Sequence, residues 1–220
     1  MNLNNIPYGY HEVTDDDVLS VLKTLKDAPL SQGLEVPKFE EEVNKRVNAN
    51  YSVAVNSATS ALHLGCLALG LKKGDYVWTS PITFVSSANC ALFCGASVDF
   101  IDIELNTGLI SIDLLKKKLI DAEKNNKLPK IIIPVHLAGT SCDMKEIHKL
   151  SLKYNFHIIE DASHAIGGSY HLNKVGSCKY SDITVFSFHP VKIITTGEGG
   201  MALTNDKNLA NHMRRLSTHG

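Results

Sequence analysis

From Tyr51 onward the chain alternates short apolar segments with segments of helical periodicity. The apolar segments are 51–56, 76–80, 97–103, 130–137, 156–161, 183–188 and 201–204. The helical segments are 60–69, 86–93, 112–123, 144–153 and 209–216. Strands that alternate with helices usually pair in parallel, and the helices cover both faces of the sheet. The pattern therefore predicts an α/β fold with a mostly parallel seven-stranded sheet and helices on both faces.

The last two predicted strands are joined differently from the others. Their connection, residues 189–200, is long enough for a crossover, but its glycines and β-branched residues disfavour a helix. Strands that lack a helical crossover more easily pair in the antiparallel direction. We therefore predict that the strand at 201–204 runs antiparallel to most of the sheet.

Residues 1–50 precede the alternation and carry two helical patterns. Thr14 and Asp17 have the spacing of a capping box, which marks the start of the first helix. That helix has an apolar stripe at helical spacing: Val18, Val21, Leu22 and Leu25. A second helix is predicted from about residue 38 to 48. We expect an N-terminal helical arm over residues 1–50 and one large domain over residues 51–220.

Composition and charge narrow the class of protein. The 220 residues include 44% hydrophobic residues and have a formal net charge of −1, so neither nucleic acid nor a membrane surface is an expected partner. The first residues, MNLNNIPYGYHE, lack the features of a signal peptide, and no apolar run approaches the roughly 18 residues of a membrane span. Five widely spread cysteines fit reduced thiols, so we expect a cytoplasmic protein.

Two of those cysteines, Cys90 and Cys94, share a helical face and could be read as metal ligands. No matching pair of cysteines or histidines has the spacing of a structural zinc site. Free cysteine is commonly buried as a small hydrophobic residue. We therefore assign both to the core and expect no metal.

The segment after the first strand has features of a phosphate site. Its residues, NSATS at 56–60, open a helix, and backbone amides at a helix N-terminus bind phosphate together with Ser and Thr hydroxyls. Simple N-capping by Ser57 or Thr59 is the alternative. Neither a P-loop nor a G-x-G-x-x-G motif occurs in the chain.

Other candidate residues lie at the carboxyl ends of predicted strands, where open α/β sheets bind ligands. Phe84 could stack on a planar ring, although core packing is the commoner fate of phenylalanine. Asp161 follows an apolar strand and needs a cationic partner, which a pyridinium nitrogen, a structural salt bridge or a helix end could supply. Ser187 ends the sixth strand.

Lys192 lies in the loop between the last two strands, with Val191 on one side and Ile193-Ile194 on the other. A lysine desolvated in an apolar pocket loses its proton more easily and can form a Schiff base. The alternative is a surface lysine with its ammonium in water. A phosphate cradle, a stacking ring, a carboxylate and a reactive lysine at one sheet edge are the groups that pyridoxal 5'-phosphate (PLP) needs. We therefore predict a PLP site.

Four motifs carry a resemblance to a known family: NSATSALH, TSPITF, EDASHAIG and FSFHPVKIITTGEGG. They resemble the nucleotide-sugar aminotransferases of the fold-type I PLP class, and the likeness runs from Ile6 to Gly220. It is strongest to members of the pseudaminic acid pathway. The resemblance implies the large domain of a fold-type I PLP transferase.

The resemblance also implies roles for individual residues. Lys192 would form the Schiff base and move protons, Asp161 would pair with the pyridine nitrogen, and His164 would lie near the phenolic oxygen. The cofactor would also be held by Ala58, Thr59, Phe84 and Ser187. The sugar nucleotide would lie near Tyr8, Ala28, Pro29, Leu30, Ser31, Ala58 and Ser187.

The implied reaction transfers an amino group from L-glutamate to the C4 keto group of a UDP-4-keto-6-deoxy-N-acetylhexosamine, in a homodimer. Another dTDP- or UDP-linked 4-keto sugar is an alternative, as is a noncatalytic protein with this fold. A related sugar dehydratase is disfavoured because those enzymes carry histidine in place of Lys192. The family continues into a C-terminal small domain that we expect to be absent here, and we expect the 220-residue chain alone to be inactive or impaired.

Overall fold

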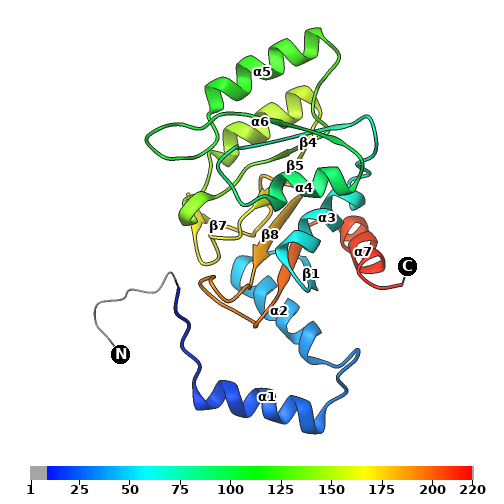
Figure 1. Ribbon diagram of the computed structural model, residues 1–220, viewed down its shortest axis with the longest axis vertical. Coiled ribbons are helices and arrows are strands. Elements are labelled where there is room, and N and C mark those ends of the chain that lie inside the picture. The colour runs from blue at the N-terminus through cyan, green and yellow to red at the C-terminus, as the bar shows by residue number, and fades with distance from the viewer. Residues whose placement is uncertain (1–8, 220) are drawn as a thin grey trace.

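The computed structural model describes residues 9–219 (Figure 1). Its α-helices are α1 (Asp15–Asp27), α2 (Glu35–Val47), α3 (Ala58–Ala68), α4 (Ser86–Phe93), α5 (Ile112–Lys124), α6 (Met144–Tyr154) and α7 (Lys207–Leu216). Its strands are β1 (Tyr51–Val55), β2 (Tyr76–Thr79), β3 (Ser97–Phe100), β4 (Ile131–Ile133), β5 (His157–Asp161), β6 (Ser169–Tyr170), β7 (Asn173–Lys174), β8 (Ile183–Ser187) and β9 (Gly200–Thr204). A short 3-10 turn, η1 (Leu137–Gly139), follows β4.

Seven of the strands form one sheet in the order β1-β9-β8-β5-β4-β2-β3. Strands β8, β5, β4, β2 and β3 pair in parallel, whereas β9 pairs antiparallel with both β1 and β8. The seven-stranded, mostly parallel sheet and its antiparallel strand at 201–204 are therefore confirmed. Because β1 and β8 are both antiparallel to β9, their carboxyl ends reach the same edge of the sheet.

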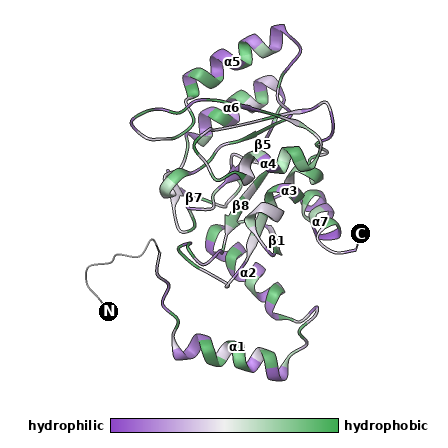
Figure 2. Ribbon diagram, in the orientation of Figure 1, coloured by the Kyte–Doolittle hydropathy of each residue, from purple (hydrophilic) through white to green (hydrophobic). Residues whose placement is uncertain are grey.

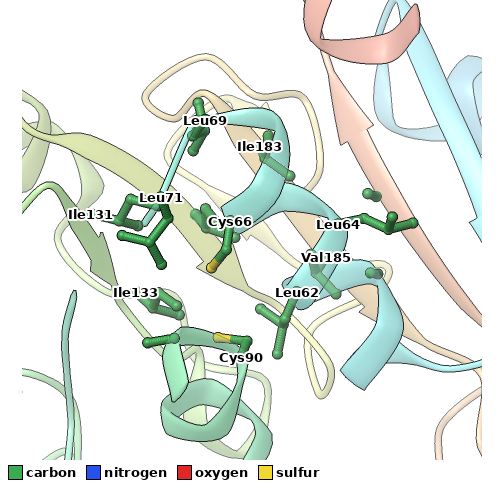
Figure 3. Packing of buried hydrophobic residues seen from close by; sticks show 14 of the residues in the cluster. Leu62, Leu64, Cys66, Leu69, Leu71, Cys90, Ile131, Ile133, Ile183 and Val185 are labelled. Atoms are coloured by element: carbon green, nitrogen blue, oxygen red, sulfur yellow. The ribbon is translucent and has the colours of Figure 1, made fainter. Parts of the chain in front are cut away.

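One face of the sheet is covered by α3, α4 and α7. Side chains of alternating strand residues, such as Ile131, Ile133, Ile183 and Val185, pack there against Leu62 and other apolar residues of α3 (Figure 3). Of the two cysteines assigned to the core, Cys90 is fully buried in this cluster and Cys94 is partly buried against it; Cys66 is fully buried there as well. Burial of strand residues on both faces explains why the strands are almost uniformly apolar.

Helices α5 and α6 cover the opposite face near β4 and β5, where Ile132 and Ile158 point toward them. Helix α2 covers the same face near β1, through Val43 and Val47. Thus α2, which belongs to the expected 1–50 arm, packs on the main sheet. The domain boundary at residue 50 stays a prediction.

Helix α1 stands apart from the rest of the molecule (Figure 1). It begins with the expected capping box, in which Thr14 and Asp17 exchange hydrogen bonds. Its apolar stripe of Val18, Val21, Leu22 and Leu25 is exposed, and no residue of the helix is buried (Figure 2). The amphipathic pattern is therefore present, but nothing in the described part of the chain covers its apolar side.

The small β6–β7 hairpin is an addition to the predicted elements. Each strand has only two residues, and the hairpin forms its own two-stranded sheet. Two-residue strands carry no period-2 pattern, so sequence periodicity cannot reveal them. Among residues 9–219, no helix combines the length and hydrophobicity that a membrane crossing requires.

Candidate active site

A cavity of about 660 Å³ lies at the carboxyl edge of the sheet, within the size range of small-molecule sites. It brings together most of the residues that the sequence indicated: Ala58, Thr59, Phe84, Asp161, His164, Ser187 and Lys192. These residues come from five separate segments of the chain. The parallel sheet explains their convergence, because the loops after its strands all emerge on one side.

The N-terminus of α3 forms one wall of the cavity. Ser57 is the N-cap, and its Oγ accepts a 3.2 Å hydrogen bond from the amide of Ser60. The amides of Ala58 and Thr59 belong to the first turn, where the helix itself provides no acceptor. The Thr59 hydroxyl lies 2.6 Å from the hydroxyl of Ser86 at the start of α4. This wall combines capping with an arrangement of donors that suits an anion.

Gly200 fits closely against this helix terminus. A Cβ at this position would lie 2.3 Å from the amide nitrogen of Ala58 and 2.2 Å from the carbonyl carbon of Ser57. Only glycine allows the first residue of β9 to approach the helix so closely. The contact fixes the start of α3 against the sheet edge.

Asp161 ends β5 and is only 4% exposed. One carboxylate oxygen accepts a 2.6 Å hydrogen bond from the hydroxyl of Ser87, and the other accepts one of 2.6 Å from Ser163. The amide of Ser163 also donates to Asp161, at 3.2 Å. Ser87 in turn lies 2.8 Å from the hydroxyl of Thr83. These serines orient the carboxylate. Ser87 lies in the first turn of α4, where serine normally indicates capping, and Ser163 lies in the turn after β5, so neither carries a sequence pattern that points to Asp161.

Lys192 is partly buried in the cavity wall. Burial lowers the pKa of its ammonium group, and the nearby charge of Asp161 opposes that effect. Val191 lines the cavity, but Ile193 and Ile194 are exposed and are not part of its lining. The lysine is therefore desolvated by the walls of the cavity and not by all of its apolar neighbours in sequence. At the base of the loop, the amide of Phe188 donates a 2.9 Å hydrogen bond to the carbonyl of Gly199, and the carbonyl of Phe188 accepts one of 3.1 Å from the amide of Thr196.

His164 lies in the segment after β5 and lines the same cavity as Asp161. Its Nδ1 accepts a 3.3 Å hydrogen bond from the amide of Ala138 in η1. Burial lowers the pKa of the imidazole, and the positive charge of Lys192 lowers it further. The ring is therefore favoured in its neutral form.

The remaining predicted site residues divide into three groups. Phe84 lies at the cavity and is 69% exposed, whereas Ser187 is buried in its floor. The loop of Ala28, Pro29, Leu30 and Ser31 connects α1 to α2 and does not line the cavity of this chain. Tyr8 lies outside the described residues. The contacts of residues 28–31 and of Tyr8 with a sugar nucleotide stay a prediction.

The residues of the cavity fit PLP. Helix amides and hydroxyls at Ala58, Thr59 and Ser187 suit a phosphate group. The buried, hydrogen-bonded carboxylate of Asp161 suits a protonated ring nitrogen, and Lys192 suits an aldehyde carbon. The cavity is also lined by three residues that no sequence motif singled out: His136, His189 and Glu198.

Comparison with known proteins agrees with this chemistry. A relative from Campylobacter jejuni, UDP-4-amino-4,6-dideoxy-N-acetyl-beta-L-altrosamine transaminase, is 43% identical over 215 residues, which cover 98% of this chain and 55% of the relative. The spore coat polysaccharide biosynthesis protein SpsC of Bacillus subtilis is 40% identical, over 98% of this chain and 53% of its own. The chain thus spans about half the length of the curated relatives that it matches.

Solved structures show the same relationship. Helicobacter pylori PseC, an aminotransferase involved in the biosynthesis of pseudoaminic acid, superposes with a TM-score of 0.90 at 34% identity, covering 97% of this chain and 56% of that protein. The PLP form of a putative sugar aminotransferase from Streptococcus pneumoniae, Spr1654, gives 0.86 at 28% identity, covering 98% and 58%. The model of the DegT/DnrJ/EryC1/StrS aminotransferase family matches residues 11–220. With its fold-type I sheet and this match, the chain belongs to the DegT/DnrJ/EryC1/StrS aminotransferase family.

Proposed function

We propose that the chain is the PLP-binding part of a sugar aminotransferase. The observation that carries the proposal is the placement of Lys192, Asp161 and the N-terminus of α3 around one cavity. A lysine with a lowered pKa, a buried carboxylate and an anion site are the three attachments that PLP uses. The same three groups do not suit hydride transfer or phosphoryl transfer, which need other motifs.

Each residue has a defined task in this proposal. When bound, PLP supplies an electron sink that makes the substrate's carbon–hydrogen bond acidic. Lys192 binds the aldehyde carbon covalently and then, as a free amine, carries the proton between carbon atoms. Asp161, held by Ser87 and Ser163, keeps the ring nitrogen protonated. The amides of Ala58 and Thr59 hold the phosphate.

Borohydride trapping tests the lysine directly. The purified chain is mixed with PLP, reduced with sodium borohydride and digested, and the modified peptide is identified by mass spectrometry. We expect one phosphopyridoxyl group, on Lys192, and no trapping in Lys192→Ala. Lys127→Ala, which removes a loop lysine outside the cavity, is the matched control and should be trapped normally. Trapping spread over surface lysines, with Lys192 unmodified, would refute the site.

For the substrate, we propose a UDP-4-keto-6-deoxy-N-acetylhexosamine, with L-glutamate as amino donor. The transaminase activity named for the Campylobacter jejuni relative and the pathway of Helicobacter pylori PseC support a 4-keto sugar of pseudaminic acid synthesis. The assay measures 2-oxoglutarate release from glutamate with UDP- and dTDP-linked 4-keto sugars. A preference for a dTDP sugar would contradict the proposed nucleotide, and transfer from another donor would contradict glutamate.

We further propose that the protein acts as a homodimer in the cytoplasm. The exposed stripe of α1 supports association, because Val18, Val21, Leu22 and Leu25 lose contact with water only against another surface. All five cysteines are free thiols, which suits a reducing compartment. Light scattering coupled to size-exclusion chromatography should give twice the chain mass. Val21→Asp should reduce that mass, whereas Lys23→Asp, on the same helix outside the stripe, should not.

A further inference from the structure

We propose that the buried pair of His136 and Glu160 is a positioning device that holds the amide of Ala138 against His164 and so keeps the proton of His164 on Nε2. Neither His136 nor Glu160 reacts with a substrate. They act through the turn η1, which follows His136 directly. The effect on the imidazole belongs to the chain itself, and only its catalytic consequence rests on the proposed function.

The pair is buried and fully engaged. His136 is 0% exposed, and its Nε2 lies 2.7 Å from one carboxylate oxygen of Glu160, which is 6% exposed. The other oxygen of Glu160 accepts hydrogen bonds from Thr184, at 3.0 Å, and from Ser181. The Nδ1 of His136 accepts a 3.3 Å hydrogen bond from the amide of Cys142. A buried polar pair is costly to separate, because each partner would be left unsatisfied.

The contacts of His136 fix both ends of the segment that carries η1. Its backbone amide donates to the carbonyl of Asp161 at 3.0 Å, which ties the start of η1 to the end of β5. Its ring, through Cys142, ties the far end of the segment. Glu160 lies next to Asp161 on β5. Its carboxylate binds both the ring of His136 and the hydroxyl of Thr184, and so links the ring to β5 and β8. The segment between 136 and 142 is therefore held at its two ends by one residue, at the start by the backbone amide of His136 and at the far end by its ring.

Inside this clamped segment, the backbone of Ala138 is strained. Its φ is 52° and its ψ is 24°, a left-handed conformation that is unfavourable for a residue with a Cβ. Such conformations persist only where the surrounding structure enforces them, and they cluster at functional sites. In this conformation the Ala138 amide donates to Nδ1 of His164. Gly139 also lies close, since a Cβ there would be 3.1 Å from the His164 carbonyl.

The amide contact determines what His164 can do. An N–H group that donates to Nδ1 requires an unprotonated Nδ1, so the neutral ring carries its proton on Nε2. The contact also stabilises the neutral ring and adds to the lowering of its pKa by burial and by Lys192, while Asp161 acts in the opposite direction. His164 therefore offers the cavity a hydrogen-bond donor without a positive charge. Such a group would donate to an oxygen of the bound cofactor.

The test measures the tautomer of His164 in the purified chain without cofactor. The chain has 10 histidines, so 15N-histidine labelling and long-range proton–nitrogen spectra need His164→Gln to assign the signals. In the wild-type chain we expect His164 to show an Nε2–H tautomer at neutral pH. In Glu160→Ala we expect the two nitrogen shifts to move toward those of a free imidazole. We also expect the pKa of His164 to rise by about half a unit or more, as an ordinary hydrogen bond to the neutral form is lost.

Glu40→Ala is the matched control for general destabilisation. Glu40 is also 6% exposed and also pairs with a cationic side chain, Arg214, far from the cavity. Both variants should melt at a lower temperature, but only Glu160→Ala should alter the signals of His164. If Glu160→Ala does not fold, His136→Phe carries the same comparison, because it keeps a planar ring but can neither accept from Cys142 nor bind Glu160.

Two results would overturn the proposal. The first is an Nδ1–H tautomer of His164 in the wild-type chain. The second is an unchanged His164 spectrum in folded Glu160→Ala or folded His136→Phe. Trapping of PLP at Lys192 is scored separately, so failure of the cofactor site and failure of this positioning device are distinguishable.

Discussion

The hydroxyl of Ser87 donates a 2.6 Å hydrogen bond to Asp161 and thereby joins the first turn of α4 to the end of β5. Both side chains are buried, so water cannot replace the bond if it is lost. Hydrogen bonds to charged groups are stronger than those between neutral groups. The carboxylate is therefore oriented before any ligand binds.

Removal of this hydroxyl should weaken both the fold and the cofactor site. We expect Ser87→Ala to lower the free energy of unfolding by about 1–3 kcal/mol and to weaken PLP binding. Urea unfolding and a spectroscopic PLP titration measure the two effects. Ser86→Ala is the control, because Ser86 is a buried neighbour that contacts Thr59 and not Asp161. Equal losses of stability and of PLP affinity in the two variants would contradict the specific role of Ser87.

Substitution of Gly200 should displace the N-terminus of α3. A Cβ would lie 2.3 Å from the Ala58 amide nitrogen, so the backbone must move. We expect Gly200→Ala to cost about 1–3 kcal/mol, as overpacking does, and to abolish phosphate-dependent binding of PLP. Gly9→Ala is the control, because its Cβ would meet Val191 at an ordinary 3.6 Å. Titration with PLP and with pyridoxal, which lacks the phosphate, measures how much the phosphate contributes to binding. An unchanged preference for PLP would refute this role of Gly200.

The reactivity of Lys192 should depend on pH in a defined window. Its folded-state pKa is lowered from 10.5, chiefly by burial, so the neutral amine forms at a lower pH than in an unfolded chain. The rate of reaction with PLP should rise with pH and level off below 10.5. Since the unfolded chain holds this proton more tightly, the lysine disfavours folding below its folded pKa, and that penalty fades as pH rises toward 10.5. Stopped-flow absorbance checks the rate against free Nα-acetyl-lysine; identical pH profiles would contradict the prediction.

The two adjacent arginines of α7 should differ in their contribution to stability, because only one of them pairs with the buried carboxylate of Glu40. Arg214 donates to both oxygens of Glu40 and to the carbonyl of Ser52, whereas Arg215 is exposed. We expect Arg214→Ala to cost about 1–3 kcal/mol, because it leaves a buried charge unpaired while its own side chain is half exposed. Arg215→Ala should change stability by less than about 0.5 kcal/mol. Parallel urea unfolding curves compare them, and equal losses would exclude the pair as the cause.

Much of the fold followed from periodicity, because strands buried on both faces must be apolar and their helices amphipathic. The antiparallel β9 was also predictable, since residues 189–200 cannot form a helical crossover. The exposure of the α1 stripe was not predictable: it has the same spacing as the stripe of a packed helix, and spacing does not say which surface, if any, covers it.

The residues of the candidate site likewise include some that sequence reasoning could identify and some that it could not. Lys192, Asp161 and the α3 terminus were accessible to sequence reasoning because each has a chemistry that needs explanation at a strand end. Ser87, Ser163 and the pair of His136 and Glu160 were not, because their roles depend on contacts between distant segments. The left-handed Ala138 gave no signal at all, since alanine normally indicates a helix.

The position of β9 has a consequence for how the site forms as the chain folds. Strand β1 pairs with β9 and with no other described strand, and the amide of Asn50 bonds to Asn205, 155 positions away in sequence. Closing so long a loop is entropically slow compared with local pairing. During synthesis, the N-terminus of α3, which would hold the phosphate, cannot pack against Gly200 until β9 has left the ribosome. The cofactor site is therefore assembled late, after the central strands have paired.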